Sequence, residues 1–457
     1  MQSIEKQKTN KSYIFKVALV ASAGGFLFGY DFVIISGALS FLDSYFHFSL
    51  AMKGLAVGSA ILGAISGPLF GLWFADKLGR RKTMMIAACC LMISTFGSAF
   101  ALTIWSFICW RFLGGIGVGL AMMTSPIYIA ELAPPHLRGS LVNVNQLSNV
   151  IGINLAVIVS YFFSFDGWGW RWMFGSQVVP VFLLVIGLLI IPESPRWLAA
   201  KNRILEALKV LTKINGKEKA EKELKEIQEE LKQETGKFSE LFQPGTKIAL
   251  LIGIVLMIFS QINGVNVTMQ YAPSIMTEVG ISVGSNAILS SIPIFILILI
   301  CTIISFKLID HYSRRGLLIT SVTFMALSHV IMAINLQQHW PPLFTLFPML
   351  LGAGAFTIGF APLSWIITSE IFPNKIRSKA IGVVCSFLYI ASFITVQVFP
   401  MLTNWFNTHF NSMAGVYWIF AGICFACVLF SWKMVPETKG LSLENISEFW
   451  LNRNKSH

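Results

Sequence analysis

Long apolar stretches recur along the whole chain and are separated by short polar connections. A helix needs about 20 apolar residues to cross the hydrocarbon core, and a spanning segment must satisfy its backbone hydrogen bonds internally. The pattern therefore predicts an all-α membrane protein with twelve transmembrane helices. The expected spans are residues 14–40, 53–75, 83–103, 105–130, 140–163, 172–192, 248–272, 286–309, 317–337, 343–370, 378–402 and 413–435.

Composition supports this interpretation. Of 457 residues, 55% are hydrophobic and only 12% are charged, against roughly 25% charged in soluble domains. The first apolar run is too long for a signal peptide and has no cleavage site, so we expect it to remain as the first span. Residues 41–52 and 273–285 are expected to form outer loops.

The formal net charge of +12 would suggest nucleic acid as the partner of a soluble protein. Here the Lys and Arg residues concentrate in alternate connections, as the positive-inside rule describes. We therefore expect a multi-pass protein of a cell membrane (inner or plasma membrane) with both termini in the cytoplasm. Its surroundings are the lipid bilayer, and no nucleic-acid partner is expected.

Three charged patterns occur twice along the chain. The second copies follow the first by 234, 239 and 244 residues (310 − 76, 370 − 131 and 437 − 193). This spacing predicts a duplicated half of six spans, an architecture in which transporters bind substrate between the halves near the midplane. The expected units are an N-terminal bundle (1–198), a cytoplasmic helical linker (199–247) and a C-terminal bundle with a short tail (248–457).

The linker is rich in Lys and Glu and places Leu224, Ile227 and Leu231 on one helical stripe. The segment is too short to bury a core of its own. We therefore expect a solvated helix that rests on the membrane domain rather than a separate catalytic domain.

Several motifs, in this order and at span-sized spacing, carry a resemblance to a known family: FGYDFVIISGA, ADKLGRRK, RFLGGIGVGL, SPIYIAELAPPHLRG, PESPRWL, QINGVNVTMQYAP, PLSWIITSEIFPNKIR and PETKG. From about residue 20 to 443, the chain resembles the sugar porters of the major facilitator superfamily. That group includes bacterial sugar–proton symporters and animal glucose facilitators. The resemblance implies import of a sugar or polyol by alternating access.

Asp31 stands inside the first span, where a charge costs about 2.5–3.5 kcal/mol on insertion scales. A candidate partner is Arg111, which is followed by glycines at 114, 115, 117 and 119 that permit close helix approach. In proton-coupled members of the family the matching residues pair, whereas facilitators carry a neutral residue at the Asp position. The resemblance therefore implies proton symport through Asp31 and Arg111. The alternative is a static ion pair that fixes helix packing.

Amides inside membrane spans can hydrogen-bond a neutral polyol, and an aromatic plate can cover its C–H face. The resemblance implies that six residues bind the sugar or lie beside it: Gln146, Asn154, Gln261, Asn266, Tyr271 and Trp365. Gly264 and Pro273 can break the helix that carries three of them. Interhelical hydrogen bonding is the alternative role of each amide, and packing is that of Trp365.

The pocket departs from the family pattern at several positions. Ser260 and Gln270 replace one residue each of a Gln pair and a Tyr pair, and the eighth span lacks its usual Asn. Leu388, Tyr389 and Ser392 stand in the eleventh span where xylose and glucose carriers tend to have larger polar or aromatic groups. A pentose, a hexose or inositol all remain open as the substrate.

Charged residues at the inner ends of the spans can form Arg–carboxylate latches, and the resemblance implies that such pairs close the cytoplasmic side. Snorkelling charges that set topology are the alternative. Lys77, His311 and Ser313 depart from the family pattern, which predicts a weaker second copy. The expected gate residues are Asp76, Arg80, Arg81, Glu131, Arg138, Glu193, Arg196, Asp310, Arg314, Arg315, Glu370, Arg377 and Glu437.

Other function classes find less support. An uncoupled facilitator conflicts with the intact Asp31, and a non-transporting sugar sensor usually carries a long signalling tail. The seven histidines show no metal-ligand spacing, and no nucleophile motif appears, so we expect no enzyme, no metal and no cofactor. Cys424 and Cys427 are interpreted as two small apolar residues on one helix face. We expect the protein to be a monomer.

Overall fold

The structure is a computed structural model that describes residues 10–134, 137–165, 169–232, 238–282, 284–373 and 375–439. The expected placement of the two chain ends lies outside these residues. Within them, 12 helical segments are long and apolar enough to cross a membrane, which confirms the predicted number of spans. The predicted division at residues 198 and 247 stays a prediction.

The first half contains six spans. Two of them are built from several pieces, because a π-helical turn follows α2 and a short break separates α7 from α8. The elements are α1 (Lys11–Phe46), α2 (Leu50–Ala64), η1 (Gly67–Gly71), α3 (Leu72–Leu78), α4 (Arg80–Ala99), α5 (Ile104–Leu132), α6 (Arg138–Phe163), α7 (Gly169–Gly175) and α8 (Val178–Ile190).

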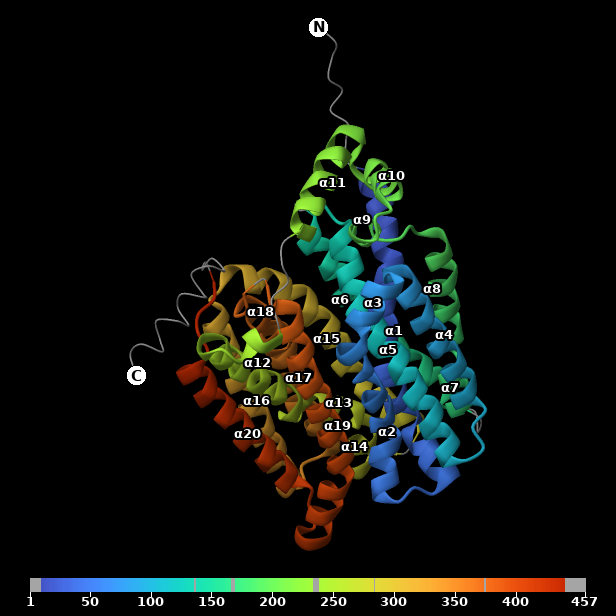
Figure 1. The fold of residues 1–457 in the computed structure, drawn as a ribbon. Helices are drawn as coiled ribbons and strands as arrows, with labels where there is room; N and C mark the ends of the chain where they lie inside the picture. Colours follow the sequence, from blue (N-terminus) through green and yellow to red (C-terminus); the bar gives the residue numbers. More distant parts are fainter. Residues whose placement is uncertain are drawn as a thin grey trace.

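Short helices connect the halves: α9 (Pro195–Ala200), α10 (Ile204–Asn215), α11 (Lys217–Lys232) and η2 (Phe238–Phe242). The helices α9 to α11 lie over one end of the first bundle, whereas η2 contacts α12 of the second (Figure 1). We call the end of the two bundles that is nearest these connecting helices the linker end, and the opposite end the far end. Leu224 of α11 is buried against Trp197, Ile227 packs beside it, and Leu231 is 39% exposed. Two of the three residues of the predicted stripe thus cover α9 and α10.

The second half also contains six spans, and two of these are interrupted. The elements are α12 (Pro244–Ile262), α13 (Val265–Gln270), α14 (Ala272–Glu278), α15 (Ser285–His311), α16 (Arg314–Gln337), η3 (Pro342–Thr345), α17 (Leu346–Ala355), η4 (Phe356–Phe360), α18 (Ala361–Glu370), α19 (Arg377–Phe410) and α20 (Ala414–Met434).

Two expected loops are largely helical, so these predictions were wrong. Within 41–52, α1 continues to Phe46 and α2 begins at Leu50; within 273–285, α14 continues to Glu278. The 36 residues of α1 extend about 54 Å at 1.5 Å per residue, and the hydrocarbon core is about 30 Å thick. Hydropathy marks only the apolar part of a helix, which here extends beyond it.

The two bundles lie side by side (Figure 1) and meet through α2 with α19, α6 with α15, and α1 with α13 and α14. Close helix approach inside the first half follows the predicted glycines of α5. A Cβ on Gly115 would collide with the backbone of Ala60, and one on Gly119 would lie 3.0 Å from the Cα of Ala64. These two glycines therefore let α2 pack directly on the helix that carries Arg111.

Candidate functional site

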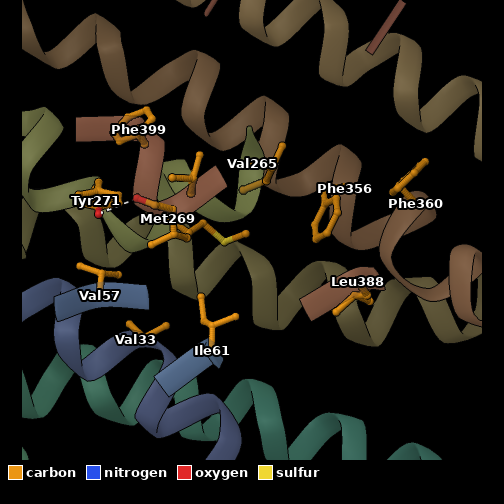
Figure 2. Close-up of a cluster of buried hydrophobic side chains, with 14 of the residues drawn as sticks. Val33, Val57, Ile61, Val265, Met269, Tyr271, Phe356, Phe360, Leu388 and Phe399 are labelled. Atoms are coloured by element: carbon orange, nitrogen blue, oxygen red, sulfur yellow. Dashed lines mark hydrogen bonds between the residues drawn. The ribbon is translucent and has the colours of Figure 1, made fainter. Parts of the chain in front are cut away.

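A central cavity of about 220 Å³ lies between the two halves. Its wall is partly apolar: Figure 2 shows Val33, Val57 and Ile61 of the first half facing Met269 and Leu388 of the second. Polar side chains from both halves complete the lining. They are Asp31, Arg111, Gln146, Asn149, Ser260, Gln261, Asn266, Gln270, Thr302, Thr357, Ser364, Trp365, Tyr389 and Ser392.

Four of the six predicted sugar-binding residues line this cavity: Gln146 from α6, Gln261 and Asn266 from the α12–α13 region, and Trp365 from α18. Trp365 is 41% exposed, so part of its ring is free to contact a solute. Amides and an indole from both halves thus face one compartment. Such an arrangement can hydrogen-bond a hydroxylated solute and cover its apolar face.

Asn154 and Tyr271 lie outside the cavity lining. Nδ2 of Asn154 donates to the carbonyl of Val150 one turn earlier, at 2.9 Å. Tyr271 is 2% exposed; its hydroxyl donates to the carbonyl of Val396 on α19 at 3.1 Å, and its ring lies 5.0 Å from that of Phe399 (Figure 2). Both side chains therefore make structural contacts in this conformation.

The helix break that the sequence predicts lies at Asn263 and Gly264. Gly264 adopts a φ of 88°, a left-handed conformation that favours glycine, and Oδ1 of Asn263 accepts from the backbone N–H of Val265 at 2.9 Å. Across the break, Nδ2 of Asn266 donates to Oε1 of Gln261 at 3.1 Å. The break thus brings two predicted amides of one span together on the cavity wall.

The predicted partners Asp31 and Arg111 form an ion pair. They are 3% and 2% exposed. Nη1 of Arg111 donates to Oδ1 of Asp31, and Nη2 lies 3.4 Å from the Asp31 carbonyl oxygen. The ring of Phe174 lies 5.4 Å from the guanidinium carbon and shields the pair from one side. A buried charge is tolerated when it is paired and hydrogen-bonded in this way.

Sequence reasoning missed Gln177, which contacts the same carboxylate. Nε2 of Gln177 lies 3.4 Å from Oδ1 of Asp31, and its Oε1 lies 3.4 Å from Oγ1 of Thr95. Gln177 is 3% exposed and precedes α8 in the sixth span. An amide inside an apolar span was the available signal, the same one that identifies Gln146.

The predicted gate residues of the first half meet at the linker end. Nη2 of Arg80 lies 2.8 Å from Oε1 of Glu131, and its Nη1 lies 3.1 Å from Asp76. Oε1 of Glu193 accepts from the backbone N–H groups of Arg80 and Arg81 at 2.9 and 3.1 Å. A carboxylate at a helix N-terminus stabilises the helix through these donors and its dipole, so Glu193 fixes the start of α4.

The second half repeats this arrangement. Nη2 of Arg314 lies 2.9 Å from Oε1 of Glu370, and Glu437 accepts from the backbone N–H groups of Arg314 and Arg315 at 3.1 Å each. Arg377 donates to the carbonyl of Phe372 at 3.2 Å. The Arg80–Glu131 and Arg314–Glu370 pairs each join two helices of the same half, so a latch between the halves stays a prediction.

The remaining predicted gate residues also lie at the linker end. Nη1 of Arg196 in α9 lies 2.9 Å from Oε2 of Glu230 in α11, a contact inside the connecting helices. Arg138 begins α6, and Asp310 is next to last in α15.

Within the described part of the chain, no group of three or more His, Cys, Asp or Glu side chains could hold a metal ion.

Comparison with known proteins gives one consistent family. The sequence profile described as "Sugar (and other) transporter" matches residues 17–450. The chain is 36% identical to the arabinose-proton symporter of Bacillus subtilis (strain 168) over 96% of this chain and 95% of that protein. It is 35% identical to the D-xylose-proton symporter of Escherichia coli (strain K12) over 96% of each. The family and these relatives are transporters rather than enzymes.

Solved structures of a sugar transporter resemble this chain over nearly its whole length. The inward-open conformation of the E. coli xylose transporter XylE superposes with a TM-score of 0.85 at 33% identity, covering 96% of this chain and all of that one. The same proton:xylose symporter bound to 6-bromo-6-deoxy-D-glucose gives 0.79 at 34% identity with the same coverage. The fold expected from the sequence, two six-helix repeats of the major facilitator type, is therefore confirmed.

Proposed function

The chain belongs to the family of sugar (and other) transporters, and from that membership we propose that it imports a sugar or polyol together with a proton by alternating access. The observation that carries this proposal is the buried Asp31–Arg111 pair on the wall of the amide-lined cavity. Solute and proton thereby bind in one compartment between two bundles that move relative to each other. Relatives named as proton symporters for arabinose and xylose support the same function.

The chemistry of the cavity favours a neutral solute. Asp31 and Arg111 neutralise each other, and the remaining polar lining consists of amides, hydroxyls and an indole. Gln146, Gln261 and Asn266 offer hydrogen-bond donors and acceptors, and Trp365 offers a flat face for C–H groups. We assign these four residues to the solute. Asn154 and Tyr271 then act by positioning α6 and the α13–α14 junction.

Coupling follows from the contacts of the Asp31 carboxylate. In this structure the buried charge of the carboxylate is compensated by Arg111. A rearrangement that separates the two side chains promotes proton uptake, and one that restores the pair promotes release. One elementary charge crossing about 100 mV supplies about 2.3 kcal/mol, which sustains roughly 50-fold accumulation.

The positions of the basic connections indicate how the protein is oriented in the membrane. We place the linker end and both chain termini in the cytoplasm, because the basic connections lie at this end. The protein then sits in a cell membrane as a monomer. The greater similarity to the inward-open relative supports a cavity that faces the cytoplasm in this conformation. The predicted gate residues at the linker end would close that side in the opposite conformation.

The test is uptake of labelled xylose, arabinose, glucose, galactose and myo-inositol into proteoliposomes, with and without an inward proton gradient. We expect gradient-driven accumulation of at least one of these solutes. Asp31→Asn removes the carboxylate that is proposed to carry the proton and should abolish accumulation, while exchange without a gradient survives. Asp43→Asn, which changes a carboxylate of the far end, should leave accumulation intact.

Other outcomes would favour the alternatives. Transport that ignores both the gradient and Asp31 would make the protein a facilitator with a static ion pair. Sugar binding without transport would make it a sensor. Neither binding nor transport of any panel member by folded protein would contradict the assignment to common sugars and inositol.

A further inference from the structure

One amide on the cavity wall lacks a partner. Gln270 is the last residue of α13, lines the cavity and is 1% exposed. Its Nε2 has no hydrogen-bond partner among the described residues. Buried polar groups are nearly always paired, and a buried donor without an acceptor carries its full desolvation penalty. This exception points to an acceptor that the protein itself does not supply.

The two residues that flank Gln270 form hydrogen bonds with both halves. The carbonyl of Met269 accepts from Oγ of Ser36 on α1 at 3.3 Å. The hydroxyl of Tyr271 donates to the carbonyl of Val396 on α19 at 3.1 Å. These two contacts hold α13 against α1 and α19, so the Gln270 side chain is positioned on the cavity wall.

The other amides of this wall are partly occupied. Nδ2 of Asn266 donates to Gln261 at 3.1 Å, and Nε2 of Gln261 donates to Oγ of Ser260 at 3.1 Å. The Asp31 carboxylate accepts from Arg111 and Gln177. Nε2 of Gln270 is therefore a side-chain amide donor that remains available to a solute at this wall.

We propose that Gln270 is a specificity-determining residue whose Nε2 donates to one oxygen of the bound sugar or polyol. The site then requires an acceptor oxygen at one position of the solute and discriminates against the analogue that lacks it. This inference rests on the proposed function, because it needs a hydroxylated solute in the central cavity. It goes further by assigning a solute contact to a residue that departs from the family pattern.

The experiment measures equilibrium exchange in proteoliposomes without a gradient. D-Xylose, L-arabinose, D-glucose, D-galactose and myo-inositol are tried first, and each exchanged solute is then competed with its own monodeoxy analogues. Wild type should bind one deoxy analogue about tenfold more weakly than the parent, the loss expected for one buried hydrogen bond. We call the affinity of the parent sugar divided by that of a deoxy analogue the deoxy ratio. Gln270→Leu and Gln270→Met should reduce the deoxy ratio of this one analogue to about one. The deoxy ratios of analogues that lack other hydroxyls should stay unchanged.

Gln397→Leu is the matched control. Gln397 on α19 also has an unpaired buried amide atom, Oε1, but it lies outside the cavity lining, and its Nε2 donates to the carbonyl of Ala51 at 2.9 Å. Its substitution should leave every deoxy ratio as in wild type. The midpoint of thermal unfolding of the Gln270 variants without sugar gives a second measure. If the Gln270 amide donates only to the solute, its loss should leave the midpoint unchanged or raise it. If the amide has a structural role, its loss should lower the midpoint.

Three results would overturn the inference, and they are distinguishable. Deoxy ratios that are identical in wild type and both Gln270 variants would show that Gln270 does not contact the solute. Equal loss of binding for all solutes in folded variants, with a lowered sugar-free midpoint, would make Gln270 structural. If wild type exchanges no panel member, the proposed function fails and the inference falls with it.

Discussion

Nε2 of His329 lies 2.7 Å from the carbonyl oxygen of Asn263, at the break between α12 and α13. A carbonyl only accepts, so this ring nitrogen carries the proton. His329 comes from α16 and is 3% exposed. The break deprives the carbonyl of its intrahelical partner, and the imidazole replaces it. A side chain outside the cavity thereby holds the residue before Gly264, and with it the position of Asn266.

His329→Phe should lower both stability and sugar affinity. Phenylalanine fills a similar volume but leaves the Asn263 carbonyl without this donor, which costs about 1–3 kcal/mol. Thermal unfolding in detergent and sugar-binding titration measure the two effects. His409→Phe is the control, because His409 is exposed and its Nδ1 bonds to the Trp405 carbonyl of its own helix at 2.8 Å. Equal midpoints for the two variants would contradict the role of His329.

A double-mutant cycle on Asp31 and Arg111 should separate coupling from packing. Arg111→Gln leaves a buried carboxylate unpaired, and Asp31→Asn leaves a buried guanidinium unpaired; breaking a buried pair typically costs about 3–5 kcal/mol. The double variant removes both charges and should be more stable than either single variant. We expect it to fold and exchange sugar but not to accumulate it. Proton-driven accumulation by the double variant would exclude this pair as the coupling site.

Much of this arrangement could be predicted from the sequence, because it follows from the chemistry of single residues inside apolar spans. Two charges at bilayer depth must neutralise each other, which identifies Arg111 as the partner of Asp31. A glycine in an apolar span marks the break at Gly264. Helical periodicity was less informative for Asn154: eight residues after Gln146, it lies about 80° past two full turns, so the two amides face different surroundings.

Other contacts between distant segments could not be predicted in this way, because at least one partner in each carries no charge that demands a counter-charge. The break at Gly264 resets the helical phase, so the direction of Tyr271 does not follow from Gln261. Gln177 contacts Asp31 across 146 residues of sequence, and His329 contacts Asn263 across 66. Gln270 was recognised as a departure from the family pattern, but its lack of a partner depends on packing from both halves.

The two copies of the charged motif should contribute unequally to stability. Both carboxylate oxygens of Glu131 are engaged, by Arg80 at 2.8 Å and by Oγ of Ser194 at 2.5 Å. Oε2 of Glu370 has no partner among the described residues, and its pair with Arg314 is more exposed. Glu131→Gln should therefore cost about 1–3 kcal/mol and Glu370→Gln up to about 1 kcal/mol.

Thermal unfolding of the two glutamine variants in the same detergent compares them directly. The Glu131 variant should have the lower midpoint, and added salt should narrow the gap between Glu370→Gln and wild type because exposed pairs are screened. The reverse order of midpoints would show that the second copy is not the weaker one.

Contact between the halves at the far end depends on small residues of α2. A Cβ on Gly54 would lie 2.9 Å from the Cα of Gln397 on α19, closer than real Cβ atoms approach. Gly54→Trp should hold α2 and α19 apart and prevent closure of this end. Alternating access requires each end to close in turn, so uptake should fall to background. The cavity residues are unchanged, so sugar binding in detergent should persist.

Gly422→Trp provides the matched control for this substitution. A Cβ at Gly422 of α20 meets nothing within 4 Å, so the same indole can be accommodated there without separating two helices. It should leave both binding and uptake near wild-type values. Wild-type uptake by Gly54→Trp would show that the far end need not close along α2 and α19. Loss of both binding and uptake in a folded Gly54 variant would instead mean that this contact shapes the cavity itself.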